Sequence, residues 1–430
     1  MIRQPTANPN KPFIFQVEKK APMLLAWFSL TFIYVLQYPL SQLLPGVNPM
    51  PNYHWNDWLV AYGFVLFSFA IFMPALYVGL SGRSVKVFQL VRPRCKSTKR
   101  IGLSIVILVF ALFASWSYLM VSLKIGMTIY TDFDSLPFRT IGILFYGRLF
   151  VQPMILAYIA TGYANLRLKW LIFFLFTVLG GWVSLSSGSR FVAIMFALPM
   201  LLLFRGKSRY FVFGITVLFF ITIATLARHF YLPFVIGDEY IHLYANETYQ
   251  ALMTENIYLI PFSYIISRPM GIAEVLMILK FGDISPSFFD SLQSFLAYFS
   301  SYISTGSITS VKVILGGSDD DFGGVGLDLF SNYWVAFGGS PILYFLGLAL
   351  VGWLLGKTYR QFAIGLRRFG LEGLTILVFI LLFILVFEAR AFLFPSLLLV
   401  SWFFSRNSFH EKFSSIGTTL TRRVLLSKQH

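Results

Sequence analysis

Five arginines stand in or beside apolar segments of the kind that lie in a lipid bilayer. They are Arg148, Arg190, Arg228, Arg268 and Arg390. Arg190 opens the apolar run Phe191 to Phe204, which gives about 21 Å of helix at 1.5 Å per residue. Because a hydrocarbon core is about 30 Å thick, Arg190 is expected inside the outer half of the membrane when Arg205 lies at the inner face.

Arg390 repeats this pattern in the last apolar segment, FEARAFLFPSLLLVSWFFSRN, where about 24 Å of helix separates it from Arg406. Each arginine could reach lipid phosphates or pair with a carboxylate in the bundle. Glu388 is not automatically the partner of Arg390, because residues two apart do not face each other on a helix. Five guanidiniums on one side of the membrane instead favour an anion site, since a guanidinium can bond two phosphate oxygens at once.

The composition is that of an all-α polytopic integral membrane protein. Apolar residues make up 57% of the chain and charged residues 12%, and the apolar runs recur along its whole length. Cys95 is the only cysteine, so neither an intramolecular disulfide nor a CxxC site is possible. The polar N-terminus, residues 1–20, lacks the pattern of a removable signal peptide, and the first apolar segment is expected to direct insertion.

The distribution of charge predicts the orientation of about ten (9–12) membrane-spanning helices. We place the spans at about 22–44, 58–80, 101–123, 141–163, 169–187, 190–205, 210–228, 329–355, 371–388 and 390–404. Alternate connections then hold 25 of the 34 Lys and Arg residues, and most of the 18 carboxylates lie on the other side. Both termini are therefore predicted to be cytoplasmic. The same rule explains the net charge of +16 without a nucleic-acid partner.

Three units follow from this topology: an N-terminal transmembrane bundle, a large outer loop, and a C-terminal group of helices with a basic cytoplasmic tail. They cover residues 1–228, 229–327 and 328–430. The loop contains apolar stretches at 258–266 and 271–282 that are too short to span the membrane. These stretches are expected to form short helices along the interface or beside the bundle. A loop of this length is usually functional.

Three sequence features together carry a resemblance to a known family. The first is SSGSRF at 186–191, a Ser/Gly-Arg turn that opens a helix. The second is the large outer loop followed by GLDLFSNYWVAFGGSPILYFLGLALVGWLLG at 326–356, and the third is the arginine that opens the last span. In these features the chain resembles the O-antigen polymerase family of bacterial oligosaccharide repeat-unit polymerases. The O-antigen ligases share much of this pattern. The likeness covers about residues 100–405.

The resemblance implies an inner-membrane enzyme of polysaccharide and lipopolysaccharide biosynthesis with a glycosyltransferase fold of the GT-C type. It would act at the periplasmic face on oligosaccharides linked to undecaprenyl diphosphate, transferring the growing glycan to a new repeat unit. Membrane lipids and a chain-length regulator are the other expected partners, and no cofactor is expected. The alternatives are an O-antigen ligase, a flippase or transporter for the lipid-linked unit, and a non-catalytic membrane scaffold.

The chemistry of this transfer assigns roles to the arginines and to several residues of the loop. A leaving diphosphate requires preorganised cations, for which Arg190, Arg268 and Arg390 are the catalytic candidates and Arg148 and Arg228 the supporting, substrate-binding ones. A general base is expected to activate the acceptor hydroxyl. The candidates for this base are Glu274, Asp283, His229, His242 and Asp328, with Glu274 favoured because it follows Arg268 by six residues in an apolar segment.

Aromatic and acidic residues complete the set of candidates. Tyr298, Tyr302 and Trp334 could stack on sugar rings or anchor the chain at the membrane interface. His242 and Asp328 are also substrate-binding candidates, although a surface or helix-capping role suits any single carboxylate. Asp319, Asp320 and Asp321 have a spacing that could hold Mg²⁺, but their glycine-rich surroundings favour a solvated turn, and no metal is expected. Neither a Walker A lysine nor an HExxH pattern is present.

Overall fold

The computed structural model shows a helical membrane protein. It describes residues 13–37, 39, 54–82, 85–87, 102–125, 144, 147–164, 168–204, 208–227, 231, 235, 271–281, 329–337, 339–368, 371–387 and 394–405. Five helices in this part of the chain are long and apolar enough to cross a membrane: Trp55–Leu80, Leu103–Ser122, Lys169–Ser187, Ser208–Leu226 and Pro341–Arg367. Leu66, Leu112, Phe174, Phe211 and Leu346, all exposed on these helices, would face lipid rather than water.

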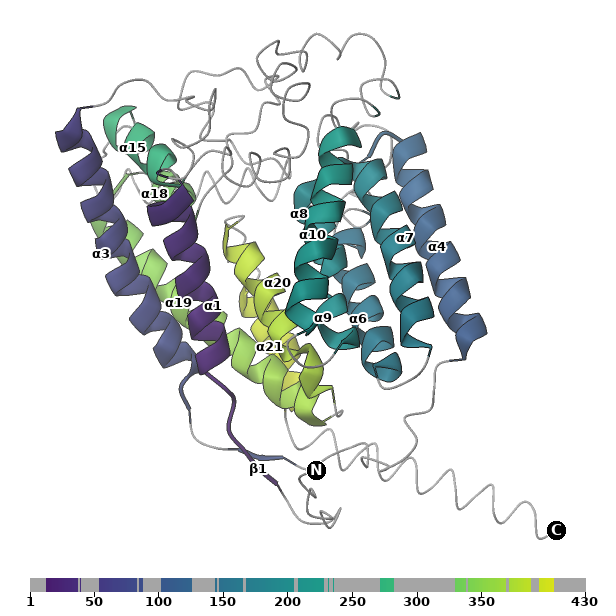
Figure 1. The fold of residues 1–430 in the computed structure, drawn as a ribbon. Coiled ribbons are helices and arrows are strands. Elements are labelled where there is room, and N and C mark those ends of the chain that lie inside the picture. The colour runs from purple at the N-terminus through teal and green to yellow at the C-terminus, as the bar shows by residue number, and fades with distance from the viewer. Residues whose placement is uncertain are drawn as a thin grey trace.

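The helices form two groups, each around its own hydrophobic core (Figure 1). The first group contains α1 (Lys20–Thr31), the π-helix η1 (Phe32–Leu36), α3 (Trp55–Leu80), α15 (Gly271–Phe281), α18 (Leu329–Ala336) and α19 (Pro341–Arg368). The second contains α4 (Leu103–Ser122), the π-helix η2 (Gly147–Val151), α6 (Gln152–Tyr163), α7 (Lys169–Ser187), α8 (Arg190–Ala197), α9 (Met200–Leu203) and α10 (Ser208–Leu226).

The C-terminal helices lie between the two groups in Figure 1. They are α20 (Thr375–Phe387), which follows the 3-10 turn η6 (Glu372–Leu374), and α21 (Phe394–Ser405). Helix α20 contributes Phe379 and Phe383 to the first core, and Leu377 and Leu381 to the second. It therefore joins the two cores, which is possible because a helix that is apolar all round can be buried on every side.

Glycines allow α3 and α19 to approach closely, which is a common device in membrane helices. A Cβ added to Gly79 would collide with the carbonyl oxygen of Trp353, and one added to Gly356 would lie 2.6 Å from the carbonyl oxygen of Leu76. Gly352 is four residues before Gly356 and faces α3 in the same way. The contact between α3 and α19 is thus a backbone-to-backbone contact that fixes the first group.

Four predicted spans agree with observed helices to within three residues, namely those of α3, α4, α7 and α10. The predicted span 329–355 is wrong in its bounds, because the chain turns at Gly339, which has a φ of 69°, and α19 begins at Pro341. Helix α19 continues to Arg368, so Lys357 and Arg360 lie on a helix and not in a connection. The predicted helix 190–205 is divided into α8 and α9 at Leu198 and Pro199.

The structure contains a short sheet that the sequence did not predict, and it describes only part of the predicted loop 229–327. Strand β1 (Phe13–Phe15) pairs antiparallel with β2 (Val85–Val87), a short addition to an otherwise helical structure. Of the predicted loop 229–327, the structure describes residues 231 and 235 and the helix α15. This helix forms from the apolar stretch 271–282 and packs against α3, η1 and α18, with Gly271 against the ring of Tyr34.

Candidate functional site

The segment SSGSR folds into a sharp corner between α7 and α8. Gly188 adopts the left-handed conformation, φ 58°, and its N–H donates to the carbonyl of Ser184 at 3.0 Å, which ends α7. The hydroxyl of Ser187 accepts from the N–H of Ser189 at 3.2 Å, and the hydroxyl of Ser189 accepts from the N–H of Val192. Glycine tolerates the left-handed conformation and serine is a preferred N-cap, so the sequence of this corner determines where α8 starts.

Arg190 is the first residue of α8, and its position follows from this corner. Its side chain is half-buried, and its Nε and Nη2 atoms lie away from the molecular surface. Helix α8 packs against α7 and α10 and also contacts η2. The structure thus places a guanidinium at the end of the second helix group where α7 and α10 both finish. We call this end the Arg190 end, which is the upper end in Figure 1.

Arg148 lies in η2, the π-helix that contacts α8, and its side chain is fully buried. Gly147 precedes it and packs against the indole of Trp116, where an added Cβ would be 2.7 Å from a ring carbon. The missing side chain therefore lets η2 lie close to α4. π-Helices are short, wide turns that often occur at functional sites, and a charge buried within a membrane bundle is costly unless it has a function or a partner.

Other buried polar side chains lie at the same end of the second helix group. Two contacts between neighbouring helices fix their level along the bundle. The indole N–H of Trp182 on α7 donates to the carbonyl of Ala114 on α4 at 3.1 Å, and Gly181 faces Ile223 on α10. The polar groups lie within about one and a half turns of these contacts or of Trp116. They are Ser117 on α4, Arg148 and Gln152 on η2 and α6, Ser184 and Ser187 on α7, and Thr225 on α10. We call this set, together with Arg190, the polar layer.

Four members of the polar layer have side-chain atoms without a hydrogen-bond partner among the described residues. These atoms are the hydroxyls of Ser117, Ser184 and Thr225 and both amide atoms of Gln152. A buried polar group left unsatisfied costs about 1–3 kcal/mol. The layer is therefore suited to receive a polar or anionic ligand, or water, at the level of Arg148.

The structure brings Arg148 and Arg190 into neighbouring elements and places Glu274 elsewhere. Glu274 belongs to α15, which packs on α3, η1 and α18 in the first helix group. Figure 1 shows α15 and α8 on different sides of the molecule. A general base at Glu274 would therefore act on a substrate group that lies beside the first helix group. Arg228, His242, Arg268, Tyr298, Asp328 and Arg390 lie outside the described residues, as do His229, Asp283, Tyr302 and the triplet Asp319 to Asp321.

Trp334 is a core residue of the first helix group. Its side chain is 5% exposed. Its ring centroid lies 5.2 Å from that of Phe64 and 5.3 Å from that of Tyr344, in edge-on contacts. Edge-on aromatic pairs of this kind add to core stability. The indole therefore packs between α18, α3 and α19.

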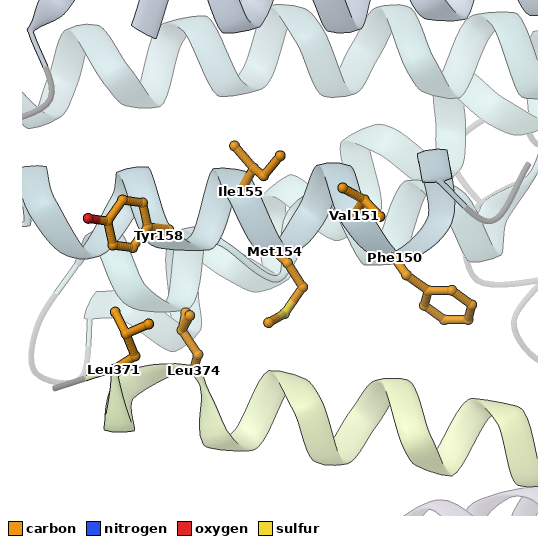
Figure 2. Close-up of a pocket in the computed structure, with 7 residues that line it drawn as sticks. All are labelled: Phe150, Val151, Met154, Ile155, Tyr158, Leu371 and Leu374. Atoms are coloured by element: carbon orange, nitrogen blue, oxygen red, sulfur yellow. The ribbon is translucent and has the colours of Figure 1, made fainter. Parts of the chain in front are cut away.

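An apolar pocket of about 380 Å³ lies on the other face of α6 from Arg148. Seven side chains line it: Phe150, Val151, Met154, Ile155, Tyr158, Leu371 and Leu374. Figure 2 shows Phe150 and Met154 pointing toward α20. Leu374 of η6 and the preceding Leu371 point back toward α6. The lining contains one hydroxyl and no charged group, so the pocket offers packing surface and not reacting groups.

Three residues of the polar layer carry large polar groups, namely Arg148, Arg190 and Gln152, and Gln152 is the one that the sequence analysis did not predict. The available signal was its spacing: in GRLFVQP, Gln152 follows Arg148 by four residues within an apolar run. Within the described part of the chain, no group of three or more His, Cys, Asp or Glu residues could hold a metal ion. The polar layer is therefore built from guanidinium, amide and hydroxyl groups.

Comparison of the chain with protein-family models, with curated proteins and with solved structures found no match.

Proposed function

We propose that this protein is a membrane glycosyltransferase that polymerises oligosaccharide repeat units linked to undecaprenyl diphosphate. The observation that carries the proposal is the fully buried Arg148, whose π-helix contacts the helix that Arg190 begins. Two guanidiniums at one end of a membrane-embedded bundle suit a diphosphate, because guanidinium binds phosphate oxygens in a bidentate manner. The resemblance of SSGSRF and of the segment 326–356 to O-antigen polymerases supplies the substrate class.

The proposed reaction is a glycosyl transfer between two lipid-linked glycans. The bond between the donor's anomeric carbon and the diphosphate oxygen breaks, and the electron pair leaves with the lipid diphosphate. A hydroxyl oxygen of the acceptor glycan forms the new glycosidic bond, and its proton passes to a general base. Arg148 and Arg190 would stabilise the negative charge that develops on the leaving diphosphate. Arg228, Arg268 and Arg390 complete this cationic set in the proposal. The acceptor glycan would lie on the first helix group's side of the site, where Glu274 of α15 is the proposed base.

The proposed architecture is of the GT-C type, with about ten spans. The shorter apolar helices Lys20–Leu36, Val192–Leu203, Thr375–Phe387 and Phe394–Phe403 supply the spans beyond the five long helices, with η2 and α6 as one more. Both termini would be cytoplasmic and the Arg190 end periplasmic in a bacterial inner membrane. The loop 229–327 would cover the site and bring His242 and Tyr298 to the glycan, and Asp328 would contact the glycan from the start of the C-terminal unit. A chain-length regulator is the expected protein partner.

Product analysis tests this proposal against its rivals. The purified protein is incubated with the lipid-linked repeat unit isolated from the source strain after deletion of this gene. A ladder of longer lipid-linked glycans is the expected result. Transfer only to a lipid A core would make the protein a ligase. Movement of the unit across vesicle membranes with no change in chain length would make it a flippase, and either of these outcomes would overturn the proposal.

A further inference from the structure

The amide of Gln152 is buried in the interior of the second helix group with no bonding partner that the described residues provide. Its side chain has no exposed surface, and neither Oε1 nor Nε2 makes a hydrogen bond within this part of the protein. An amide offers two donors and an acceptor that accepts twice. Leaving all of these groups without hydrogen bonds in a membrane interior is unfavourable. A bound molecule is therefore expected to make hydrogen bonds with this amide.

Gln152 and Arg148 lie on the same face of one helix. Arg148, Gln152, Leu156 and Ala160 recur at four-residue intervals and are all buried, and the last two belong to the second core. Side chains at this spacing lie above one another on one face of a helix. The opposite face carries Val151, which is exposed, and the apolar pocket. Gln152 and Arg148 therefore face the bundle interior together.

Two helices that pack against α6 and η2, namely α7 and α8, add further donors suited to an oxyanion. The hydroxyl of Ser184 on α7 is also buried and without a hydrogen-bond partner among the described residues. The contact between η2 and α8 places the helix of Arg190 beside that of Arg148. Guanidinium, amide N–H and hydroxyl groups are all donors to phosphate oxygens, and hydrogen bonds to a charged acceptor are the strong ones.

We infer that Gln152 is a substrate-contacting residue that donates from Nε2 to an oxygen of a diphosphate held by Arg148. This inference rests on the proposed function and adds a residue to its site. The Oε1 atom accepts from a hydroxyl of the first sugar or from a water molecule at the same place. The diphosphate is that of a lipid carrier or a free diphosphate, because the two present the same oxygens to the amide.

The test uses the full-length protein in detergent and the variant Gln152→Met, which keeps the length of the side chain and removes its amide. Binding is measured by titration with geranylgeranyl diphosphate, with inorganic pyrophosphate, and with geranylgeraniol as the chain without a diphosphate. Gln361→Met is the matched control, because Gln361 is a half-buried glutamine in the last part of α19, a helix of the first group. Thermal unfolding of each ligand-free protein is recorded alongside.

The expected result is that Gln152→Met binds the lipid diphosphate at least about tenfold more weakly than the wild type. Its ligand-free midpoint of unfolding should not fall, because removing an unsatisfied buried amide is expected to be neutral or stabilising. Gln361→Met should bind as the wild type does. If Gln152→Met does not fold, Gln152→Glu keeps the shape of the side chain and should weaken binding further by placing a negative charge beside the anion.

The outcomes separate this inference from the proposed function. Equal affinity in the wild type and the folded Gln152 variant would overturn the inference and leave the proposed function standing. Absence of binding of either diphosphate to the wild type would overturn both. Tighter binding of geranylgeranyl diphosphate than of pyrophosphate assigns the lipid carrier as the ligand. Equal binding of the two assigns the diphosphate group alone. Either result supports the role of Gln152 when the variant binds more weakly than the wild type.

Discussion

Gln152 lies one helical turn after Arg148, and both side chains are fully buried on the same face of one membrane helix. The other face of this helix is apolar, with Val151 52% exposed and Ile155 37% exposed. The helix therefore presents polar groups inward and apolar groups outward at the same height in the bundle. Polar and charged groups inside a membrane protein mark functional positions more often than they stabilise the fold.

The corner at Gly188 sets the position of Arg190, so it can be tested by its conformation. Gly188→Ala places a Cβ at a φ of 58°, and a left-handed residue with a Cβ costs about 1–2 kcal/mol. We expect a lower midpoint of thermal unfolding and a loss of glycan extension. Gly181→Ala is the control on the same helix, because the added Cβ there meets Ile223 at 3.5 Å, an ordinary contact. An unfolding midpoint for Gly188→Ala equal to that of the control would contradict this account of the corner.

The close contact between α3 and α19 predicts opposite responses of two glycines on one helix. Gly79→Ala forces a methyl group into the backbone of α19, whereas Gly63 has nothing within 4 Å of an added Cβ. We expect Gly79→Ala to lower the unfolding midpoint, since overpacking typically costs about 1–3 kcal/mol. Gly63→Ala should leave it unchanged or raise it slightly. Thermal unfolding in detergent compares the two, and a Gly79→Ala protein as stable as Gly63→Ala would show that the helices are not in this contact.

The hydroxyl of Tyr34 on η1 links this π-helix to α18 through a hydrogen bond. The N–H of Phe330 donates to the hydroxyl of Tyr34 at 2.9 Å, and the two rings stack with centroids 4.5 Å apart. Tyr34→Phe keeps the stacking but leaves a buried N–H without its acceptor, which costs about 1–3 kcal/mol. Tyr118→Phe removes an exposed hydroxyl from α4 and serves as the control. Only the first substitution should lower the unfolding midpoint; a comparable effect of both would point to the detergent environment instead of this bond.

Hydropathy and charge predicted much of the fold because membrane spans depend on length and composition. The helices α3, α4, α7 and α10 are long, apolar and bounded by polar residues, and each was placed correctly. The start of α19 was misplaced because the turn at Gly339 lies within an apolar stretch that a hydropathy pattern reads as continuous. A positive φ at one glycine is a local backbone choice that composition does not reveal.

The candidate site could be predicted only in part for a similar reason. Charge in an apolar segment identified Arg148 and Arg190 without structural information. Their relationship depends on the contact between η2 and α8, which are separated by α6 and α7 in the sequence. Gln152 carries no charge, and its four-residue spacing from Arg148 indicates a shared buried face only when the packing of the helix is known. The packing of Trp334 into a core likewise depends on Phe64 and Tyr344, which come from two other helices.

In the proposed reaction the guanidiniums of Arg148 and Arg190 bind the leaving diphosphate. The most direct measurement is the rate of glycan extension on lipid-linked repeat units by Arg148→Lys and Arg190→Lys, with Arg209→Lys as the control. Lysine keeps the positive charge and removes the planar fork that bonds two oxygens. Arg209 packs on its neighbour Tyr210 near the start of α10, away from the Arg190 end.

We expect extension to fall by at least about tenfold in each of the two site variants, corresponding to about 1.4 kcal/mol of lost transition-state stabilisation. The control should extend glycans at the wild-type rate. All three proteins should unfold at similar temperatures. Wild-type rates in both Arg148→Lys and Arg190→Lys, in proteins that fold and bind the repeat unit, would contradict the claim and remove these arginines from the site.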